Sequence, residues 1–277
     1  MNRRLPCFVL LLIVLAWSKA AAQSQPAARS LFDKGINAMV GGASQNNLEA
    51  LDLMRRSAEM GYAPAQVVMG YMVENGSITF NGKTTGINTP AEPGQAVDWY
   101  KKAAMQGDRL AYWLLGRMYY AGSGVQQDLS QAEVWFQKAV ALNDPFAEYL
   151  LGQIKLQRQD YAKAADLFRR AAVQGLPQAQ AQLGLLLKDG KGLTGNNSEA
   201  YSWLLVAYEN GVRAMAPELS ALEAVLGTNE TETAKSRARE LQQASLRAIT
   251  AKGCTGWEGE NAPLPAPPPP DIQSFCR

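Results

Sequence analysis

The sequence contains no histidine among its 277 residues. Histidine is the commonest general base in enzymes, the usual partner of catalytic serine and cysteine, and a frequent metal ligand. Its absence weighs against most hydrolases, and the carboxylates show no pair whose spacing indicates a shared site. Gly190-Lys191-Gly192 lacks the preceding strand and the full spacing of a nucleotide-binding loop, which indicates a turn. We therefore expect no catalytic residue, no cofactor and no metal site.

Long apolar runs are also scarce, and the longest stands near the N-terminus. Arg3 and Arg4 precede the run at residues 8–17, and small alanines follow it up to Ala22. This layout is typical of a secretory signal peptide, so we expect residues 1–22 to be removed. The alternative, a membrane anchor, needs about 20 apolar residues to span a bilayer. Cys7 lies before the run, so a lipoprotein signal is not indicated.

Charge of one sign is not in excess. Cleavage after Ala22 would leave 24 basic against 25 acidic side chains, because three of the 27 basic residues precede it. We therefore expect no nucleic-acid partner, and no stable membrane anchor after cleavage. Export would place the remaining cysteines, Cys254 and Cys276, in a compartment that permits disulfides, and two is the smallest even number that can pair.

Five alanines mark an internal repeat, because the residues around them recur at fixed offsets. A residue that mostly suits a helix N-cap stands four positions earlier, and three after each cap follows Glu or Gln, which completes a capping box, except at Lys163. Eleven positions after each alanine comes Gly or Asn, which closes a helix in the left-handed conformation. We name the predicted helices the capped helices. Their alanines are Ala50, Ala96, Ala132, Ala164 and Ala200, their caps Asn46, Glu92, Asp128, Asp160 and Asn196, and their closing residues Gly61, Gly107, Asn143, Gly175 and Gly211.

A core-facing stripe is predicted at the third and seventh positions after each alanine. The third-position residues are Leu53, Trp99, Trp135, Leu167 and Trp203, and the seventh-position residues are Ser57, Ala103, Ala139, Ala171 and Ala207.

A second kind of helix lies between the capped helices. Each of these glycine helices has an alanine, a large apolar residue four positions later and then Gly70, Gly116, Gly152 or Gly184. Glycine inside a helix costs about 1 kcal/mol relative to alanine, which predicts a neighbouring helix close by, with the third-position side chains filling the space. Neither kind of helix can bury its apolar face alone, so stacking of successive pairs predicts an α-solenoid.

The stretch Ala111-Tyr-Trp-Leu-Leu-Gly-Arg-Met-Tyr-Tyr-Ala-Gly-Ser-Gly-Val-Gln-Gln-Asp128, followed by Ala132, Trp135 and Phe136, resembles a Sel-one-like repeat, a subclass related to tetratricopeptide repeats. The resemblance covers residues 29–211 and depends on several copies in phase. Residues 147–175 lack the Gly-x-Gly-Val loop, and the first glycine helix, near residues 31–39, is degenerate. The resemblance implies an all-α fold of about five helix pairs in a right-handed superhelix, which serves as an adaptor in bacterial envelope assemblies, signalling or contact with host proteins. It implies no common reaction.

Three segments depart from the repeats, which we assign to residues 23–211. Between residues 75 and 92, Asn81-Gly82 predicts either a small hairpin or an irregular loop, and this insertion is either a partner contact or a tolerated surface feature. Residues 212–251 predict two C-terminal capping helices, the second started by Asn229 with a polar outer face. The tail, residues 252–277, has six prolines between positions 262 and 270, which favour a polyproline II spacer. The residues beside this rod can fold back along it, so a Cys254–Cys276 bridge is sterically possible.

Candidate binding residues come from the early positions of the glycine helices, which in a solenoid often line the concave side. They are Tyr112, Trp113, Arg117, Tyr149 and Gln153. Two interpretations remain open, because such side chains either hold a partner or complete the core.

The leading hypothesis is a periplasmic or secreted scaffold whose concave groove binds a protein or peptide. One alternative is an envelope enzyme that acts weakly on β-lactams or peptidoglycan, since some cysteine-rich proteins of the resembled family are associated with β-lactams, although this chain lacks their cysteine pairs. Another is a glycan-binding protein without turnover.

Overall fold

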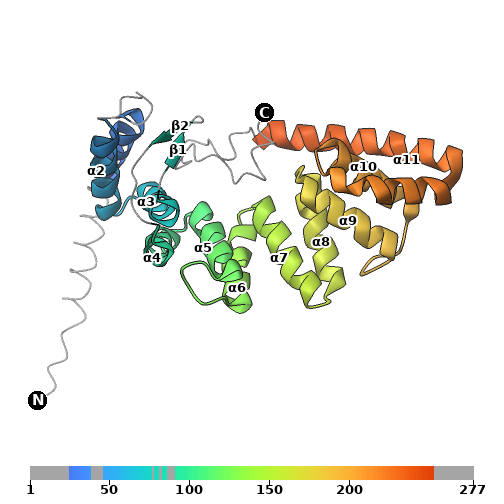
Figure 1. The fold of residues 1–277 in the computed structure, drawn as a ribbon, viewed down its shortest axis with the longest axis horizontal. Helices are drawn as coiled ribbons and strands as arrows, with labels where there is room; N and C mark the ends of the chain where they lie inside the picture. Colours follow the sequence, from blue (N-terminus) through green and yellow to red (C-terminus); the bar gives the residue numbers. More distant parts are fainter. Residues whose placement is uncertain (1–24, 39–45, 77, 81–82, 86–90, 253–277) are drawn as a thin grey trace, which may run out of the picture. The chain divides into compact units, whose positions relative to one another are not determined.

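The computed structural model describes residues 25–38, 46–76, 78–80, 83–85 and 91–252. The predicted signal peptide, the Pro-rich tail, Cys254 and Cys276 lie outside these residues. The described part is helical apart from one short hairpin (Figure 1). A helix over residues 25–38 precedes α2 (Asn46–Glu59), α3 (Ala63–Asn75), β1 (Ile78–Phe80), β2 (Lys83–Thr85), α4 (Pro93–Ala104), α5 (Arg109–Ala121), α6 (Leu129–Val140), α7 (Pro145–Gln157), α8 (Tyr161–Val173), α9 (Pro177–Asp189), α10 (Asn197–Glu209), a short 3-10 turn (Arg213–Met215) and α11 (Ala216–Lys252).

The helices alternate as predicted. The capped helices are α2, α4, α6, α8 and α10, and the glycine helices are α3, α5, α7, α9 and the helix over residues 25–38. This alternation confirms an all-α solenoid of five helix pairs. The contacts group into two compact units, one with the described residues up to Ala111 and with Ser123–Val125, the other with Tyr112–Gly122 and the described residues from Gln126 onward.

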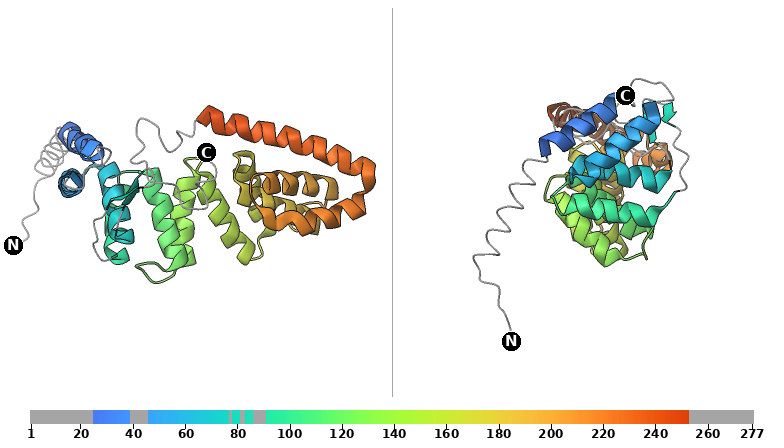
Figure 2. Two further views of the ribbon diagram at one scale, coloured as in Figure 1. Left: turned by 45° about the horizontal axis from the view of Figure 1, so that its top comes forward. Right: turned by 90° about the vertical axis from the view of Figure 1, so that its left-hand side faces the viewer.

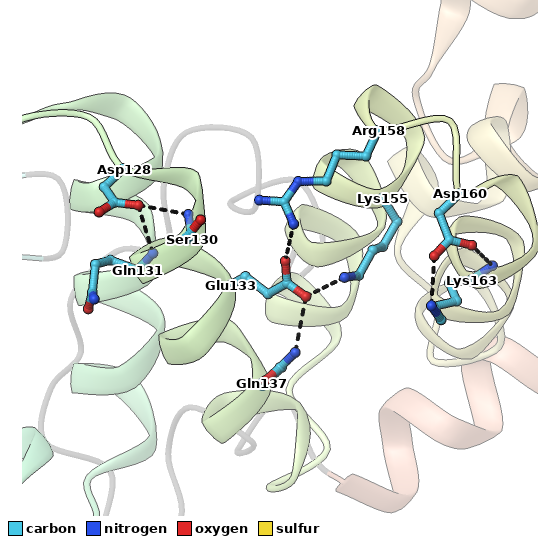
Figure 3. Close-up of polar contacts among 9 residues, drawn as sticks. All are labelled: Asp128, Ser130, Gln131, Glu133, Gln137, Lys155, Arg158, Asp160 and Lys163. Carbon is cyan, nitrogen blue, oxygen red and sulfur yellow. Dashed lines mark hydrogen bonds and ion pairs between the residues drawn. The ribbon is translucent and has the colours of Figure 1, made fainter.

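The predicted helix starts are confirmed at three of the five caps. Asp128 accepts hydrogen bonds from the amides of Ser130 (2.8 Å) and Gln131 (3.0 Å), as Figure 3 shows. Asp160 and Asn196 cap α8 and α10 in the same way. Glu92 makes no side-chain cap to a backbone amide, and the side chain of Asn46 lies outside the described residues.

The second half of the capping box is replaced by contacts between helices. The cap amides of Glu92, Asp128 and Asn196 donate to backbone carbonyls of the preceding glycine helix, at 2.7, 2.9 and 3.1 Å. These carbonyls satisfy the amides, which were predicted to bond to the side chains three residues later. The bonds join each of these capped helices to its own glycine helix.

All five predicted closing residues are left-handed. Gly61, Gly107, Gly175 and Gly211 have φ between 85° and 105°, and Asn143 has φ 57°. In each repeat the amide that follows donates to the carbonyl of the seventh-position residue, at 2.9 to 3.3 Å. This bond completes the six-residue closure that ends a helix.

Each helical glycine contacts the next capped helix, but not through the predicted third position. A Cβ built on Gly152 would lie 2.6 Å from the ring of Phe168, and one on Gly184 would lie 2.7 Å from Leu204. The filling residues stand four positions after the repeated alanine, where one further helical step turns the side chain into the core. They are Met54, Tyr100, Phe136, Phe168 and Leu204, each fully buried, against Gly35, Gly70, Gly116, Gly152 and Gly184. Gly35 shows that the first pair also follows the rule despite its degenerate sequence.

Two of the three segments outside the repeats lie in the described part of the chain, and their secondary structure agrees in outline with the prediction from the sequence. β1 and β2 pair antiparallel, with Phe80 opposite Lys83, which confirms a hairpin although Asn81 and Gly82 lie outside the described residues. α11 breaks at Gly227 (φ 71°, ψ 176°), so it consists of two helices that lie beside α10, as the left view in Figure 2 shows. The second helix follows Gly227 directly, so Asn229 lies within it and does not start it.

Two cap aspartates have pKa values shifted in opposite directions. Asp108, at the start of α5, accepts a hydrogen bond from the amide of Ala111 (2.8 Å), yet its burial raises the pKa of its carboxyl. For exposed Asp160, the hydrogen bond from Lys163 lowers the pKa. Each shift links folding stability to pH, with opposite sign.

Replacing Gly152 with alanine should lower the free energy of unfolding by about 1–3 kcal/mol, because the new methyl group overlaps the Phe168 ring. This cost exceeds the gain of about 1 kcal/mol in helix propensity. Urea unfolding followed by circular dichroism measures the change. Gly94→Ala in α4 is the control, since its Cβ would meet its nearest neighbour at 3.6 Å, and it should cause no loss. Equal stability of wild type and Gly152→Ala would contradict the close helix contact.

Replacing Asp108 with asparagine should keep the cap and remove a carboxylate that is costly to ionise in the fold. Because the pKa of Asp108 is raised in the fold, the native state favours the protonated carboxyl. The contribution of this group to the free energy of unfolding is lost as pH rises through the folded pKa. The variant should therefore gain stability relative to wild type from about pH 4 upward. Asp160→Asn should show the reverse, with a loss at neutral pH that disappears in acid. Melting temperatures of the three proteins between pH 3 and pH 7 test both signs.

Candidate functional site

The five candidate binding residues lie on two glycine helices, α5 and α7, but their contacts divide them into three side-chain groups. Tyr112 is half-buried and stacks on Trp135 of α6, with ring centroids 6.1 Å apart and planes 28° apart. Lys138, one turn further along α6, lies over the faces of both rings. Tyr112 thus belongs to a small surface cluster with α6.

The second group is built around Trp113, which is 5% exposed. Its ring meets Phe146 of α7 edge-on at 6.4 Å, and the guanidinium of Arg117, a half-buried residue, lies over it at 5.7 Å. An indole this buried serves mainly to pack α5 against α7. Of this pair, Arg117 is the residue with accessible surface.

The third group joins Tyr149 and Gln153 on one face of α7. The Gln153 amide donates to the Tyr149 hydroxyl at 3.0 Å, and the Tyr149 ring packs on Phe168 at 5.8 Å. Both side chains are half-buried. They remain partly accessible while the Tyr149 ring contacts the core, so both interpretations of the sequence stay open for this pair.

Sequence reasoning missed a set of buried polar residues. Each directly follows the repeated alanine of its glycine helix, at the position that Tyr112 occupies in α5: Gln66 is 5% exposed, Glu148 1% and Gln180 0%. Polar residues of a helix are normally expected on its solvent-exposed face, so the sequence alone did not indicate that these three are buried. The signal available was their recurrence immediately after that alanine.

These residues form what we name polar rungs, contacts to the residue that precedes the closing residue of the next capped helix. Gln106 donates to Gln66 at 2.8 Å, and Gln174 donates to Glu148 at 2.6 Å. Asn210 donates to Gln180 at 3.1 Å. Gln66 and Gln180 also donate back to the carbonyls of Ala58 and Ala172, on the preceding capped helices. Each of these two glutamines therefore bridges two successive capped helices.

Two further polar contacts extend this arrangement. Gln242 of α11 exchanges hydrogen bonds with Asn210, so the last rung continues into the C-terminal helix. Arg170 forms an ion pair with buried Glu148 at 2.5 Å. A buried carboxylate without a partner would destabilise the fold. The rungs and the Arg170 ion pair supply such partners to the buried polar groups.

Figure 3 shows a charged contact between α6 and α7. The carboxylate of Glu133 accepts from Lys155, from Arg158 (2.7 Å) and from Gln137 (3.2 Å). Glu133 and Lys155 are each only 15% exposed, so this network joins the two helices more effectively than an open surface pair would. We assign it a role in packing.

The glycine loop after α9 packs against the start of α8. Gly190 and Gly192 are left-handed, and a Cβ on Gly192 would overlap the backbone of Tyr161 and Ala162 at the start of α8. Lys191 pairs with Asp189. The loop backbone therefore covers the start of another helix, in agreement with the turn predicted from the sequence.

The described residues provide little for reaction chemistry. Within them, no group of three or more Cys, Asp or Glu side chains could hold a metal ion. Asp128, Asp144 and Asp160 cap helices, while Glu133 and Glu148 pair with cations. Across the same residues, the structure contains no helix with the length and apolar character that a membrane span requires. What the arrangement offers is a set of side chains suited to contact.

Comparison with known proteins agrees with this geometry. The family model described as Sel1 repeat matches residues 28–62, 63–108, 109–144, 145–176 and 177–212, and each match holds one glycine helix and one capped helix. A Sel1 repeat protein from Oxalobacter formigenes is similar in structure, with a TM-score of 0.60 and 23% identity over 76% of this chain and 84% of that one.

A second similar structure is a protective antigen of uropathogenic Escherichia coli strains with an SLR fold. Its TM-score is 0.64 and its identity 25%, over 89% of this chain and 54% of that one, so the match spans about half of that protein. Sel1 repeat proteins are helical-repeat scaffolds that generally mediate protein–protein interaction. Since the five matches extend from residue 28 to residue 212, the chain belongs to the Sel1 repeat family.

Proposed function

We propose that the protein is an exported adaptor, which binds a protein or peptide partner in the bacterial envelope or outside the cell. The observation that carries this proposal is the contrast between buried polar side chains, which stabilise the repeats, and half-buried side chains, which remain accessible to a partner. Buried polar residues such as Gln66 and Glu148 form hydrogen bonds within the repeats. Four of the candidate residues of α5 and α7 are half-buried aromatic, amide or guanidinium residues, whose accessible parts form edges at the surface. Such edges suit contact with another chain.

The chemistry of the described residues supports binding over catalysis. A general base needs a titratable group within hydrogen-bond reach of a reacting atom. The carboxylates of Glu133, Glu148 and Asp128 are instead committed to cations or backbone amides. We therefore propose a protein without enzymatic activity of its own.

The proposal of export depends on the N-terminal sequence. Two arginines, a ten-residue apolar run and small alanines before Gln23 have the order of a signal peptide. Similarity to a protective antigen of uropathogenic Escherichia coli is in keeping with a protein of the envelope or exterior. The place of action is periplasmic or extracellular in this proposal.

Cell fractionation of a bacterium that expresses the whole chain tests export. We expect the protein in the periplasm or the medium, with Gln23 as its first residue by mass spectrometry. Replacing Leu11 and Leu12 with arginine should interrupt the apolar run and retain the protein, uncleaved, in the cytoplasm. An unprocessed wild-type chain in the cytoplasm would refute the proposal of export.

Photo-crosslinking in intact cells tests the adaptor role. A photoreactive residue at Gln153 of α7 should yield discrete adducts with a protein, because this half-buried face is a candidate contact surface. The same group at Arg239, an exposed position of α11, is the matched control and should yield fewer adducts. Purified protein is assayed in parallel with a chromogenic β-lactam and peptidoglycan fragments. Turnover, or glycan binding without protein adducts, would refute the adaptor role.

A further inference from the structure

Two of the five repeats lack the polar rung at both of its ends. In the first repeat the two positions hold Leu31 and Met60, both apolar. The other is the repeat of α5 and α6. In α5 the rung position holds Tyr112, where the three repeats with a rung have Gln66, Glu148 and Gln180. Its partner position after α6 holds Leu142, which is 43% exposed. Losing one partner would leave a buried polar group unsatisfied, whereas replacing both by apolar surface can be nearly neutral for stability. The paired change thus frees this position from its structural task.

The repeat of α5 and α6 retains a basic residue beside the rung position, although the acidic residue with which it would pair is absent. Arg170 of α8 lies six residues after the repeated alanine and pairs with Glu148, the rung residue of α7. Lys138 of α6 has the same offset, but its rung residue is Tyr112, which carries no charge. Among the residues that the structure describes, Lys138 forms no ion pair, and it lies over two aromatic rings, 4.3 Å from the Trp135 centroid and 5.5 Å from that of Tyr112.

The geometry points to a docking site for an acidic peptide segment of a partner protein, formed by Tyr112, Trp135 and Lys138 with Leu142 beside them, and it rests on the adaptor function proposed above. The ammonium of exposed Lys138 would bind the carboxylate of an Asp or Glu, which supplies the charge that Glu148 supplies in the following repeat. The stacked rings and Leu142 would take an apolar neighbour of that residue.

The sequence offers an internal test of specificity. Lys102 of α4 has the same offset as Lys138 and also lies over a tryptophan, Trp99, at 4.1 Å. In that repeat, however, the rung is intact, because Gln106 bonds to Gln66. A site created by the broken rung therefore requires Lys138 and not Lys102.

The experiment pans a random 12-residue peptide library, displayed on phage, against the mature full chain. We expect enrichment of peptides with Asp or Glu beside an apolar residue. A fluorescent copy of an enriched peptide then serves as the probe for anisotropy titrations. Lys138→Gln should weaken its binding about tenfold and flatten its salt dependence, and Lys102→Gln should leave the affinity unchanged.

The double variant Tyr112→Gln with Leu142→Gln rebuilds the rung that three of the other repeats have. It should melt at the wild-type temperature or above and still lose at least tenfold in affinity, which separates binding from folding. If enriched peptides bind the Lys138→Gln and double variants unchanged, or if the Asn and Gln analogues of the peptide bind equally well, this site is wrong while the adaptor function stands.

Other occupants give different results. If removal of residues 253–277 is needed before any peptide binds, the chain's own tail occupies the site, and if affinity changes with self-association, a second copy does. Either result overturns the assignment to a partner. If no peptide is enriched and photo-crosslinking at Gln153 captures no protein, both the site and the adaptor function fall.

Discussion

The helical glycine of each repeat determines how near the next helix can approach. Without a Cβ, the glycine helix leaves room for a side chain that reaches the core from the capped helix, and Tyr100, Phe136 and Phe168 fill that room completely. The cost of glycine in a helix is offset by burial of a large apolar group. Because the same contact recurs in all five pairs, the pairing within each repeat is fixed even where the rest of the sequence varies.

The polar rungs add selectivity to this apolar packing. Apolar contacts tolerate rotation and sliding, whereas Gln66 and Gln180 each bond to the capped helices before and after them, so their hydrogen bonds are satisfied in one register only. Asn210, which forms the last rung with Gln180, also exchanges hydrogen bonds with Gln242 and so attaches α11. The C-terminal helices therefore end the array by continuing its contacts while their outer face stays charged and exposed.

Many polar side chains of the described residues take part in structural contacts. Carboxylates such as Asp128 and Glu148 cap a helix or pair with a cation, and the glycine loop of α9 covers the start of α8. The repeat around α5 and α6 is different, because its rung is absent and Lys138 lies on an aromatic pair. This difference is the reason that we propose the docking site in this repeat.

The sequence by itself determined the helix ends, the alternation of two helix kinds and the solenoid class. Caps such as Asp128 and closing residues such as Asn143 act on backbone groups a few residues away, so their effect can be predicted from the local sequence. Only the tertiary structure decided which side chain meets each glycine, how Gln66, Glu148 and Gln180 are satisfied, and that Tyr112 separates from Trp113 and Tyr149. These choices join residues 8 to 40 positions apart on different helices, and one step of about 100° around a helix changes the neighbour entirely.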